Sequence, residues 1–461
     1  MVQDDTISAV ATAIGEGGIG IIRMSGPQSV SIADKLFVGS KGQRASEVAS
    51  HYACYGAIVD PAAGQTVDEV LLLVMKAPRS YTRENVVEIH CHGGPVPLRK
   101  ILELTLRFGA RLAEPGEFTK RAFLNGRLDL AQAEAVIDII RAKTDASLKL
   151  AVNHLSGQLS GVVRIVRDDT LEMIAHLEAA IDFPEDDIEE ISSQQVDEKL
   201  IPVMDKLEHL LATAQTGRIL REGLQTVIIG KPNVGKSSLL NALLREKRAI
   251  VTDIPGTTRD IIEEYVNIQG IPLKIVDTAG IRETEDLVEQ LGVQRAREFI
   301  DKADLILLLL DSSSPLTEED KQVLELLAGR QALVLINKTD LPQKLDMSEI
   351  MQYSKEYQLL RISVQNGTGM DLLEKAIVER VYSGQVTQRE GAYVTNVRHI
   401  HVLRQAYHHL EEARHTIAMN MPPDCIVVDL RAAWEKLGEI TGDTVGEDLL
   451  DQIFSRFCIG K

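Results

Sequence analysis

Hydrophobic and polar positions divide the chain into four stretches with different periodicities. Residues 1–118 contain short β-like apolar runs, such as 86–90, separated by glycine and proline. Residues 119–220 place apolar side chains three and four positions apart, which is the spacing of an amphipathic helix. In residues 221–383 short β-branched runs alternate with helical patterns, and in 384–461 the helical spacing returns. The periodicity therefore changes three times along the chain.

The helical stretches contain recognisable boundaries. Asp129 and Gln132 have the spacing of a capping box, so a helix is expected to begin there. A second, longer helical stretch is expected over 148–181, ahead of a proline and an acidic run. In the last stretch the spacing predicts a helix over 401–419 and another whose apolar stripe covers 449–457.

The order of these stretches predicts a multidomain protein. Strands that alternate with helices indicate a parallel α/β sheet, here a Ras-like P-loop domain over 221–383. The helical stretches 119–220 and 384–461 flank it, so we expect one discontinuous helical domain into which the α/β domain is inserted. Residues 1–118 form a separate N-terminal α+β domain in this interpretation.

Composition narrows the range of functions. The 461 residues include 50 Lys and Arg against 68 Asp and Glu, a net charge of −18, which excludes a basic protein that coats nucleic acid. Any RNA contact must use a local basic patch or a partner's surface. The four cysteines lie far apart without C-x-x-C spacing, and no apolar run is long enough for a bilayer. We expect a cytoplasmic protein with reduced thiols and no membrane partner.

Residues 230–237 read G-K-P-N-V-G-K-S and fit the phosphate-loop pattern G-x-x-x-x-G-K-[ST]. A strand-like run precedes the loop and a helical pattern follows it, as such a loop requires. The glycines allow backbone N–H groups to surround phosphate oxygens at a helix N-terminus. Lys236 is expected to reach the β- and γ-phosphates and Ser237 to hold Mg²⁺.

Three further segments specify GTP. Thr258 can bind Mg²⁺ and sense the γ-phosphate, and residues 277–280 (D-T-A-G) suit the metal and the γ-phosphate. The Asp340 carboxylate accepts from two guanine N–H groups that adenine does not offer. The whole set is similar to the translation-factor class of GTPases. The predicted GTP-binding residues are Asn233, Val234, Gly235, Lys236, Ser237, Ser238, Thr252, Asp253, Ile254, Pro255, Gly256, Thr257, Thr258, Asp277, Thr278, Ala279, Gly280, Asn337, Lys338, Thr339 and Asp340.

The chain lacks the usual water-positioning glutamine, because Ile281 follows the D-T-A-G segment. Two devices can replace it. Glu289 lies further along the same segment and can orient or deprotonate the water. Alternatively, a cation can neutralise charge between the phosphates, with Asn233 and the carbonyls of residues 252–257 as ligands.

Several motifs together resemble one family from end to end. They are G-I-G-I-I-R at 18–23, P-G-E-F at 115–118, R-A-F-L-N-G at 121–126, V-T-D-I-P-G-T-T-R at 251–259 and the final F-C-I-G-K at 457–461. These motifs resemble the MnmE (TrmE) family of bacterial tRNA-uridine modification GTPases. The C-I-G-K sequence is especially specific.

The resemblance implies a homodimer formed through the N-terminal domains and a G domain that dimerises with K⁺ and GTP. It implies Glu289 as the catalytic carboxylate. The implied metal ligands are Asn233, Thr252, Ile254 and Thr257 for K⁺, and Ser237 and Thr258 for Mg²⁺.

The resemblance also implies a reduced folate (5-formyl- or methylene-tetrahydrofolate) held near Arg23, Glu88, Arg127 and Lys461. Cys458 becomes a candidate catalytic thiol, although its place on an apolar stripe is more typical of a packed side chain. The family works with an FAD-binding partner, MnmG, and installs an aminomethyl-type group at C5 of the wobble uridine. We expect tRNA to bind mainly through that complex.

Three alternatives stay open at this point. A ribosome-assembly GTPase would usually add a basic RNA-binding module, which these acidic flanks lack. A slow, partner-regulated switch is favoured by the absent glutamine and disfavoured by Asn233 with Glu289. A folate-binding module with a purely regulatory G domain would bind folate without K⁺-stimulated turnover.

Overall fold

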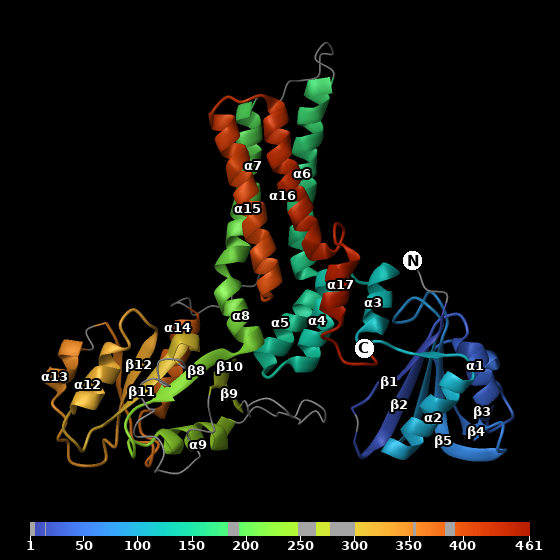
Figure 1. Cartoon of the computed structure of the whole chain (residues 1–461), viewed down its shortest axis with the longest axis horizontal. Coiled ribbons are helices and arrows are strands. Elements are labelled where there is room, and N and C mark those ends of the chain that lie inside the picture. Colours follow the sequence, from blue (N-terminus) through green and yellow to red (C-terminus); the bar gives the residue numbers. More distant parts are fainter. Residues whose placement is uncertain are drawn as a thin grey trace.

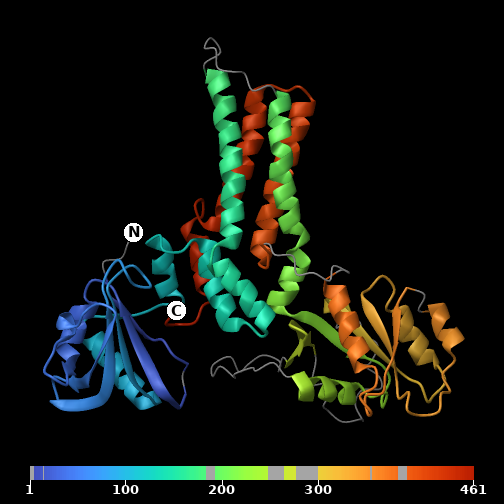
Figure 2. The same cartoon turned by 180° about the vertical axis from the view of Figure 1, so that it is seen from behind.

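The molecule, a computed structural model, consists of two α/β bodies joined through a helical bundle (Figure 1). The same arrangement seen from behind confirms that the bundle stands between the two sheets (Figure 2). The predicted fold class is confirmed. The structure describes residues 5–13, 15–182, 193–247, 264–276, 300–353, 356–382 and 392–461.

The N-terminal body is built on a seven-stranded sheet in the order β3-β4-β5-β6-β2-β1-β7. Its strands pair antiparallel except for β1 and β7. The two helices of this body pack on the sheet and bury a core that includes Ile22, Leu72 and Ile89. The elements are β1 Ile7–Val10, β2 Gly17–Ser25, α1 Ser29–Leu36, β3 Phe37–Gly39, the 3-10 turn Ala45–Glu47, β4 Tyr52–Asp60, β5 Gln65–Met75, β6 Val86–Gly93, α2 Pro95–Arg107 and β7 Arg111–Leu112.

The helical domain is assembled from both sides of the inserted α/β body. Helices α6, α7, α15 and α16 pack against one another along the bundle and share one apolar core (Figure 1). The helices are α3 Glu117–Leu124, α4 Leu130–Arg141, α5 Asp145–Leu155, α6 Gln158–Asp182, α7 Ser193–Ala212, α8 Ala214–Glu222, α15 Val397–Ala418, α16 Pro423–Thr441 and α17 Glu447–Phe454.

Two boundary predictions in this domain have different outcomes. The capping box is confirmed, because the Asp129 carboxylate accepts from the Gln132 amide at 2.9 Å. The stretch expected over 148–181 is helical but divided into two helices, because α5 ends at Leu155 and α6 begins at Gln158. Gly157, with a φ of 87°, breaks the helix in a left-handed conformation that glycine adopts without steric cost.

The inserted body has a six-stranded sheet in the order β13-β12-β11-β8-β10-β9. All neighbours are parallel except β9 and β10. The aliphatic run 305–310 lies in β11 and is buried. The elements are β8 Leu224–Ile229, α9 Lys236–Lys247, β9 Glu264–Ile268, β10 Ile271–Ile275, β11 Leu305–Asp311, α12 Glu318–Glu325, β12 Ala332–Asn337, α13 Met347–Tyr353, β13 Gln358–Arg361 and α14 Met370–Val381.

The order of the strands positions a ligand site. Strand β8 lies between β10 and β11, so the strands that follow it in the chain lie first on one side of it and then on the other. Parallel sheets bind ligands at such a switch point, beyond the carboxyl ends of the strands. The loop after β8 is the predicted phosphate loop.

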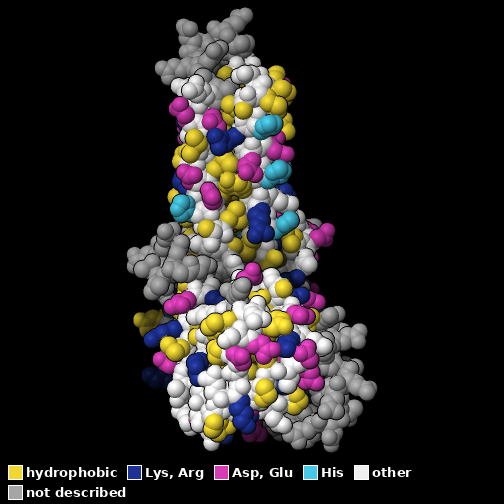
Figure 3. All heavy atoms as spheres, turned by 90° about the vertical axis from the view of Figure 1, so that its left-hand side faces the viewer, with side chains coloured by type: hydrophobic (Ala, Val, Ile, Leu, Met, Phe, Trp, Pro, Cys, Tyr) yellow, Lys and Arg dark blue, Asp and Glu magenta, His cyan; other side chains and the backbone are white. Residues whose placement is uncertain are grey.

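Figure 3 shows how charged and apolar side chains are distributed over one face of the molecule. Acidic, basic and apolar side chains are interspersed over the inserted body and the bundle, with histidines along the bundle. This face therefore shows no broad basic surface for nucleic acid. Among the described residues, no helix is both long and apolar enough to cross a membrane.

Candidate nucleotide site and N-terminal pocket

The phosphate loop curls around the Lys236 ammonium group. Its Nζ donates to the carbonyl oxygens of Gly230 at 2.8 Å and Lys231 at 2.6 Å. Burial lowers the pKa of this lysine. Gly230, Asn233 and Gly235 all have positive φ angles, of 143°, 62° and 104°. This curled backbone is the conformation that turns successive N–H groups toward an anion.

Gly235 has no space for a side chain. A Cβ there would lie 2.4 Å from Nδ2 of Asn337. Helix α9 begins one residue later, so Ser237 and Ser238 lie in its first turn. Unpaired N–H groups and the helix dipole favour phosphate at such a terminus. The loop and the helix thus form an anion site from backbone groups.

Asn337 ties the base-recognition segment to the phosphate loop. Its Nδ2 donates to the Val234 carbonyl at 2.8 Å, and its Oδ1 accepts from the Val364 amide at 3.1 Å. Asp340 is held in turn, because the Ser363 hydroxyl donates to its Oδ1 at 2.6 Å. Two predicted segments more than ninety residues apart therefore meet beside one loop.

The neighbouring residues of this segment fix its backbone. Thr339 donates through its hydroxyl to the Ile362 carbonyl at 3.0 Å. Lys338, with a φ of 61°, pairs with the Asp311 carboxylate at 2.7 Å. Because Val364 contacts Asn337 through its amide, this contact does not depend on the side chain at position 364.

The remaining predicted nucleotide and metal residues lie outside the described residues. Of the K⁺ and Mg²⁺ ligands implied by the resemblance, the structure describes Asn233 and Ser237. Those outside it are Thr252, Asp253, Ile254, Pro255, Gly256, Thr257, Thr258, Asp277, Thr278, Ala279, Gly280 and Glu289.

A second constellation lies in the N-terminal body, where Arg23 of β2 faces Glu88 of β6 in register. The Arg23 Nε donates to Glu88 Oε1 at 2.8 Å, and His90 Nε2 lies 3.2 Å from the other carboxylate oxygen. Arg23 also donates through Nη1 to the Gly460 carbonyl at 3.2 Å. Arg23 thus connects the sheet to the far end of the sequence.

The CIGK segment, residues 458–461, is seated on the N-terminal body. Ile459 forms a β-bridge with Pro115, and the Gly116 amide donates to the Cys458 carbonyl at 3.4 Å. Gly460 has a φ of 90°, and a Cβ there would lie 2.2 Å from the Val10 carbonyl oxygen. Only glycine therefore fits this approach.

The first and last residues of this segment differ in exposure. Cys458 is exposed, so the interpretation of its side chain as packed is wrong. The sequence placed it on the stripe of α17, but the helix ends at Phe454. Lys461 is partly buried, and burial together with the charge of Arg23 lowers its pKa.

Tyr81 is a residue of this site that the sequence did not predict. The guanidinium of Arg127 lies 4.8 Å from its ring centre and that of Arg23 lies 5.9 Å from it. Arg127 also donates to the Tyr81 carbonyl at 2.9 Å. A pocket of about 570 Å³ lies beside Tyr81 and Arg127. No periodicity or motif marks a single tyrosine in this loop.

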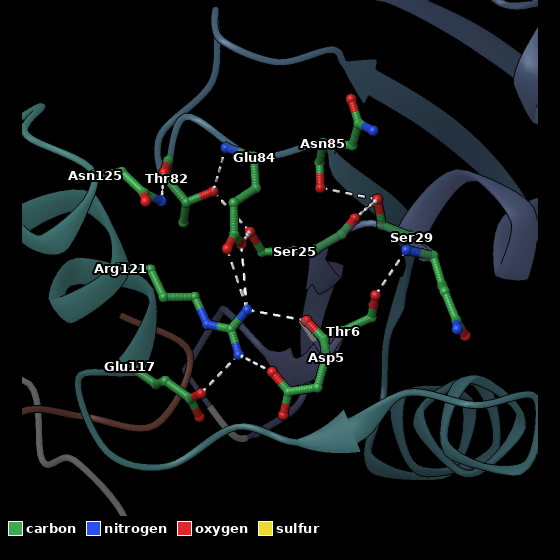
Figure 4. A network of polar contacts seen from close by, with 12 residues as sticks. Asp5, Thr6, Ser25, Ser29, Thr82, Glu84, Asn85, Glu117, Arg121 and Asn125 are labelled. Carbon is green, nitrogen blue, oxygen red and sulfur yellow. Dashed lines mark hydrogen bonds and ion pairs between the residues drawn. The ribbon is translucent and has the colours of Figure 1, made fainter. Parts of the chain in front are cut away.

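A buried ionic network holds the loop that carries Tyr81 (Figure 4). Arg121 of α3 donates to Asp5 at 2.6 Å, Glu117 at 2.9 Å and Glu84 at 3.3 Å. Glu84 also accepts from the Ser25 hydroxyl at 2.6 Å. Burial alone would raise the pKa of Glu117, but bonds from Arg111, the Glu114 amide and Arg121 outweigh it and lower the pKa.

The phosphate loop, its position at the switch point of the sheet and the N-K-T-D segment beside it define a P-loop GTPase. Two family profiles also match the chain. One described as "MnmE helical domain" matches residues 130–458, and one described as "GTP-binding protein TrmE N-terminus" matches residues 6–127.

Full-length relatives agree. The "tRNA modification GTPase MnmE" of Geobacillus kaustophilus is 54% identical over 462 residues, covering 100% of both chains. That of Alkaliphilus metalliredigens is 53% identical over 461 residues, with 100% of both chains covered. That of Bacillus subtilis is 53% identical over 458 residues, 99% of this chain and 100% of the relative. The chain belongs to the MnmE family of tRNA modification GTPases.

Proposed function

We propose that the chain is a K⁺-dependent GTPase that modifies the wobble uridine of certain tRNAs. Together with an FAD-binding partner subunit of the MnmG type, it takes a one-carbon unit from a reduced folate. The product carries an aminomethyl-type group at C5 of the uridine. One observation carries the proposal: the helical domain seats its CIGK segment against Arg23 and leads through α8 directly into the phosphate-loop strand.

The chemistry of the loop supports the nucleotide part. Asn233 lies in the loop with an amide oxygen that suits K⁺, and Ser237 offers a hydroxyl to Mg²⁺. Glu289 is the proposed catalytic carboxylate, which orients the attacking water in place of the absent glutamine. Hydrolysis would drive the opening and closing of paired G domains.

The N-terminal constellation suits a reduced folate. A pterin presents adjacent N–H donors, which the Glu88 carboxylate can accept while Arg23 holds it in place. Tyr81 offers an aromatic face, and Arg127 and Lys461 offer cations for the carboxylates of the folate tail. The folate, when bound, supplies the one-carbon unit.

The proposal extends to assembly. We propose a cytoplasmic homodimer formed through the N-terminal domains, with tRNA bound mainly in the complex with the FAD-binding subunit. The net charge of −18 supports this division, because an acidic chain alone binds RNA weakly.

The deciding experiment is GTP turnover of the purified chain in KCl and in NaCl at equal ionic strength. We expect strong stimulation by K⁺ that Glu289→Ala abolishes. Glu325→Ala, which removes an exposed carboxylate on α12, is the matched control and should retain the stimulation. Equal, slow turnover of the unmodified chain in both salts would reject the mechanism and favour a partner-regulated switch.

A further inference from the structure

A second, larger pocket lies where the base of the helical domain meets the G domain. Its volume is about 970 Å³, near the upper end for small-molecule sites. Its walls come from α4, α5 and α8, from strands β8, β9 and β10 of the G-domain sheet, from residues 395–398, and from α17 with the segment that follows it. Figure 1 shows these elements gathered at the foot of the bundle. Neither the nucleotide residues nor the proposed folate residues line it.

The lining of this pocket is basic in an otherwise acidic chain. It contains six cationic side chains and three carboxylates, so its formal charge is 6 − 3, or +3. The carboxylates are already engaged: Glu134 pairs with Arg398 at 2.9 Å and Asp138 with Arg221 at 2.8 Å. The third, Glu222, lies 4.0 Å from Arg221.

Three of the six cations, Arg141, Lys143 and Arg456, form no ion pair with a carboxylate in the described part of the chain. Arg141 donates to the Arg456 carbonyl at 2.9 Å, and the Lys143 ammonium lies 5.4 Å from the Tyr265 ring centre. Cations that line one pocket repel one another unless an anion joins them.

The CIGK segment connects this pocket to the proposed folate site. Cys458 lines the pocket, and two residues later Gly460 accepts from Arg23 of the N-terminal body. A nucleotide presented to the CIGK segment therefore has a basic pocket beside it, where Arg141 and Arg456 lie.

We infer that this pocket binds the phosphodiester backbone of the RNA substrate beside the nucleotide that is modified. The inference rests on the proposed function and adds a location on this chain. A single phosphate would fill little of the volume, whereas a strand segment brings several charges to the three cations. The walls belong to both the helical domain and the G domain. A change in the relative position of the two domains would therefore alter the affinity for RNA.

The test is binding of a fluorescent anticodon stem-loop RNA to the full chain, followed by anisotropy in about 50 mM salt, where weak binding is measurable. The pocket variant combines Arg141→Gln, Lys143→Gln and Arg456→Gln. The control variant combines Lys41→Gln, Lys100→Gln and Lys375→Gln, three exposed cations on other elements. Both variants change the net charge from −18 to −18 − 3, or −21.

We expect the pocket variant to bind the RNA at least about tenfold more weakly than the control variant, with a salt slope lower by up to about three. Equal weakening of both variants would overturn the inference. Complete displacement of the RNA by millimolar UMP would assign the pocket to a free mononucleotide and would also overturn it.

Two further measurements distinguish loss of RNA contacts from loss of the fold and from failure of the proposed function. Thermal unfolding of both variants shows whether the fold survives, and Arg456→Gln alone provides a milder variant. K⁺-stimulated GTP turnover reports on the proposed function independently, because none of the three cations belongs to the nucleotide site. Normal turnover with unchanged RNA binding would reject the pocket and leave the proposed function standing.

Discussion

The two α/β bodies of this molecule build their sites in opposite ways. In the mainly parallel sheet of the G domain, the predicted nucleotide residues that the structure describes lie near one switch point and come from short contiguous segments. In the mainly antiparallel N-terminal sheet, Arg23 and Glu88 lie side by side on neighbouring strands, and the CIGK segment arrives from the other end of the sequence. The first site depends on local backbone geometry and the second on long-range docking.

This difference predicts that each of the two sites can be damaged without loss of the other. Damage to the phosphate loop should abolish nucleotide binding and leave the N-terminal pocket intact. Substitutions that displace the CIGK segment should weaken the N-terminal site and leave nucleotide binding intact. Two glycines in tight, left-handed positions, Gly235 and Gly460, offer equivalent substitutions in the two sites.

The largest effect is expected for Gly235→Ala. The new methyl group would lie 2.4 Å from Asn337 Nδ2, at a φ of 104° that disfavours any side chain. We expect the affinity for a fluorescent GDP to fall at least about 100-fold, roughly 2.7 kcal/mol. Gly329→Ala is the control, since its φ is 73° but no atom lies within 4 Å. Similar affinities for the two variants would contradict a backbone-built site.

A smaller effect is expected for Gly460→Ala. Its Cβ would lie 2.2 Å from the Val10 carbonyl, so the CIGK segment must shift away from Arg23. We expect affinity for 5-formyltetrahydrofolate, measured by calorimetry, to fall about tenfold. Nucleotide affinity should change by less than about twofold, because distant sites act independently.

Gly446→Ala, where no atom lies within 4 Å of the added Cβ, is the matched control for the CIGK segment. It should bind folate like the unmodified chain. A parallel loss of GDP affinity in Gly460→Ala would show that the two sites are not separable.

The smallest effect is expected for Ser363→Ala, which removes the 2.6 Å hydrogen bond to the Asp340 carboxylate. The carboxylate stays in place but loses one restraint, so GDP affinity should fall about fivefold, near 1 kcal/mol. The same GDP titration measures it, with Ser348→Ala on the exposed surface of α13 as the control. An unchanged affinity would mean that Asp340 is positioned by the backbone alone.

The same contrast explains what the sequence could predict. Asn337 and Asp340 were predicted because each belongs to a contiguous motif with a fixed chemical role. Arg23 and Glu88 came only from the family resemblance, since 65 residues separate them and no periodicity pairs them. Their contact in the structure results from the register between β2 and β6.

Three other features were not predicted because they depend on the three-dimensional structure and belong to no sequence motif. Tyr81 was missed because its position depends on a loop that the Arg121 network holds. The break at Gly157 was missed because apolar spacing continues across it, and only the backbone conformation reveals the end of α5. The exposure of Cys458 was missed for a related reason: the apolar stripe extends past the last helical residue of α17.

Arg23 and Gly460 lie 437 positions apart in the sequence, so they are synthesised at different times. A ribosome adds about 5–20 residues per second, so the arginine emerges on the order of 20 to 90 seconds before its partner. During that interval the nascent N-terminal sheet can fold and pair Arg23 with Glu88, but the CIGK segment is not yet present to contact Arg23. Chemistry that needs that contact therefore begins only after the GTPase domain has been synthesised.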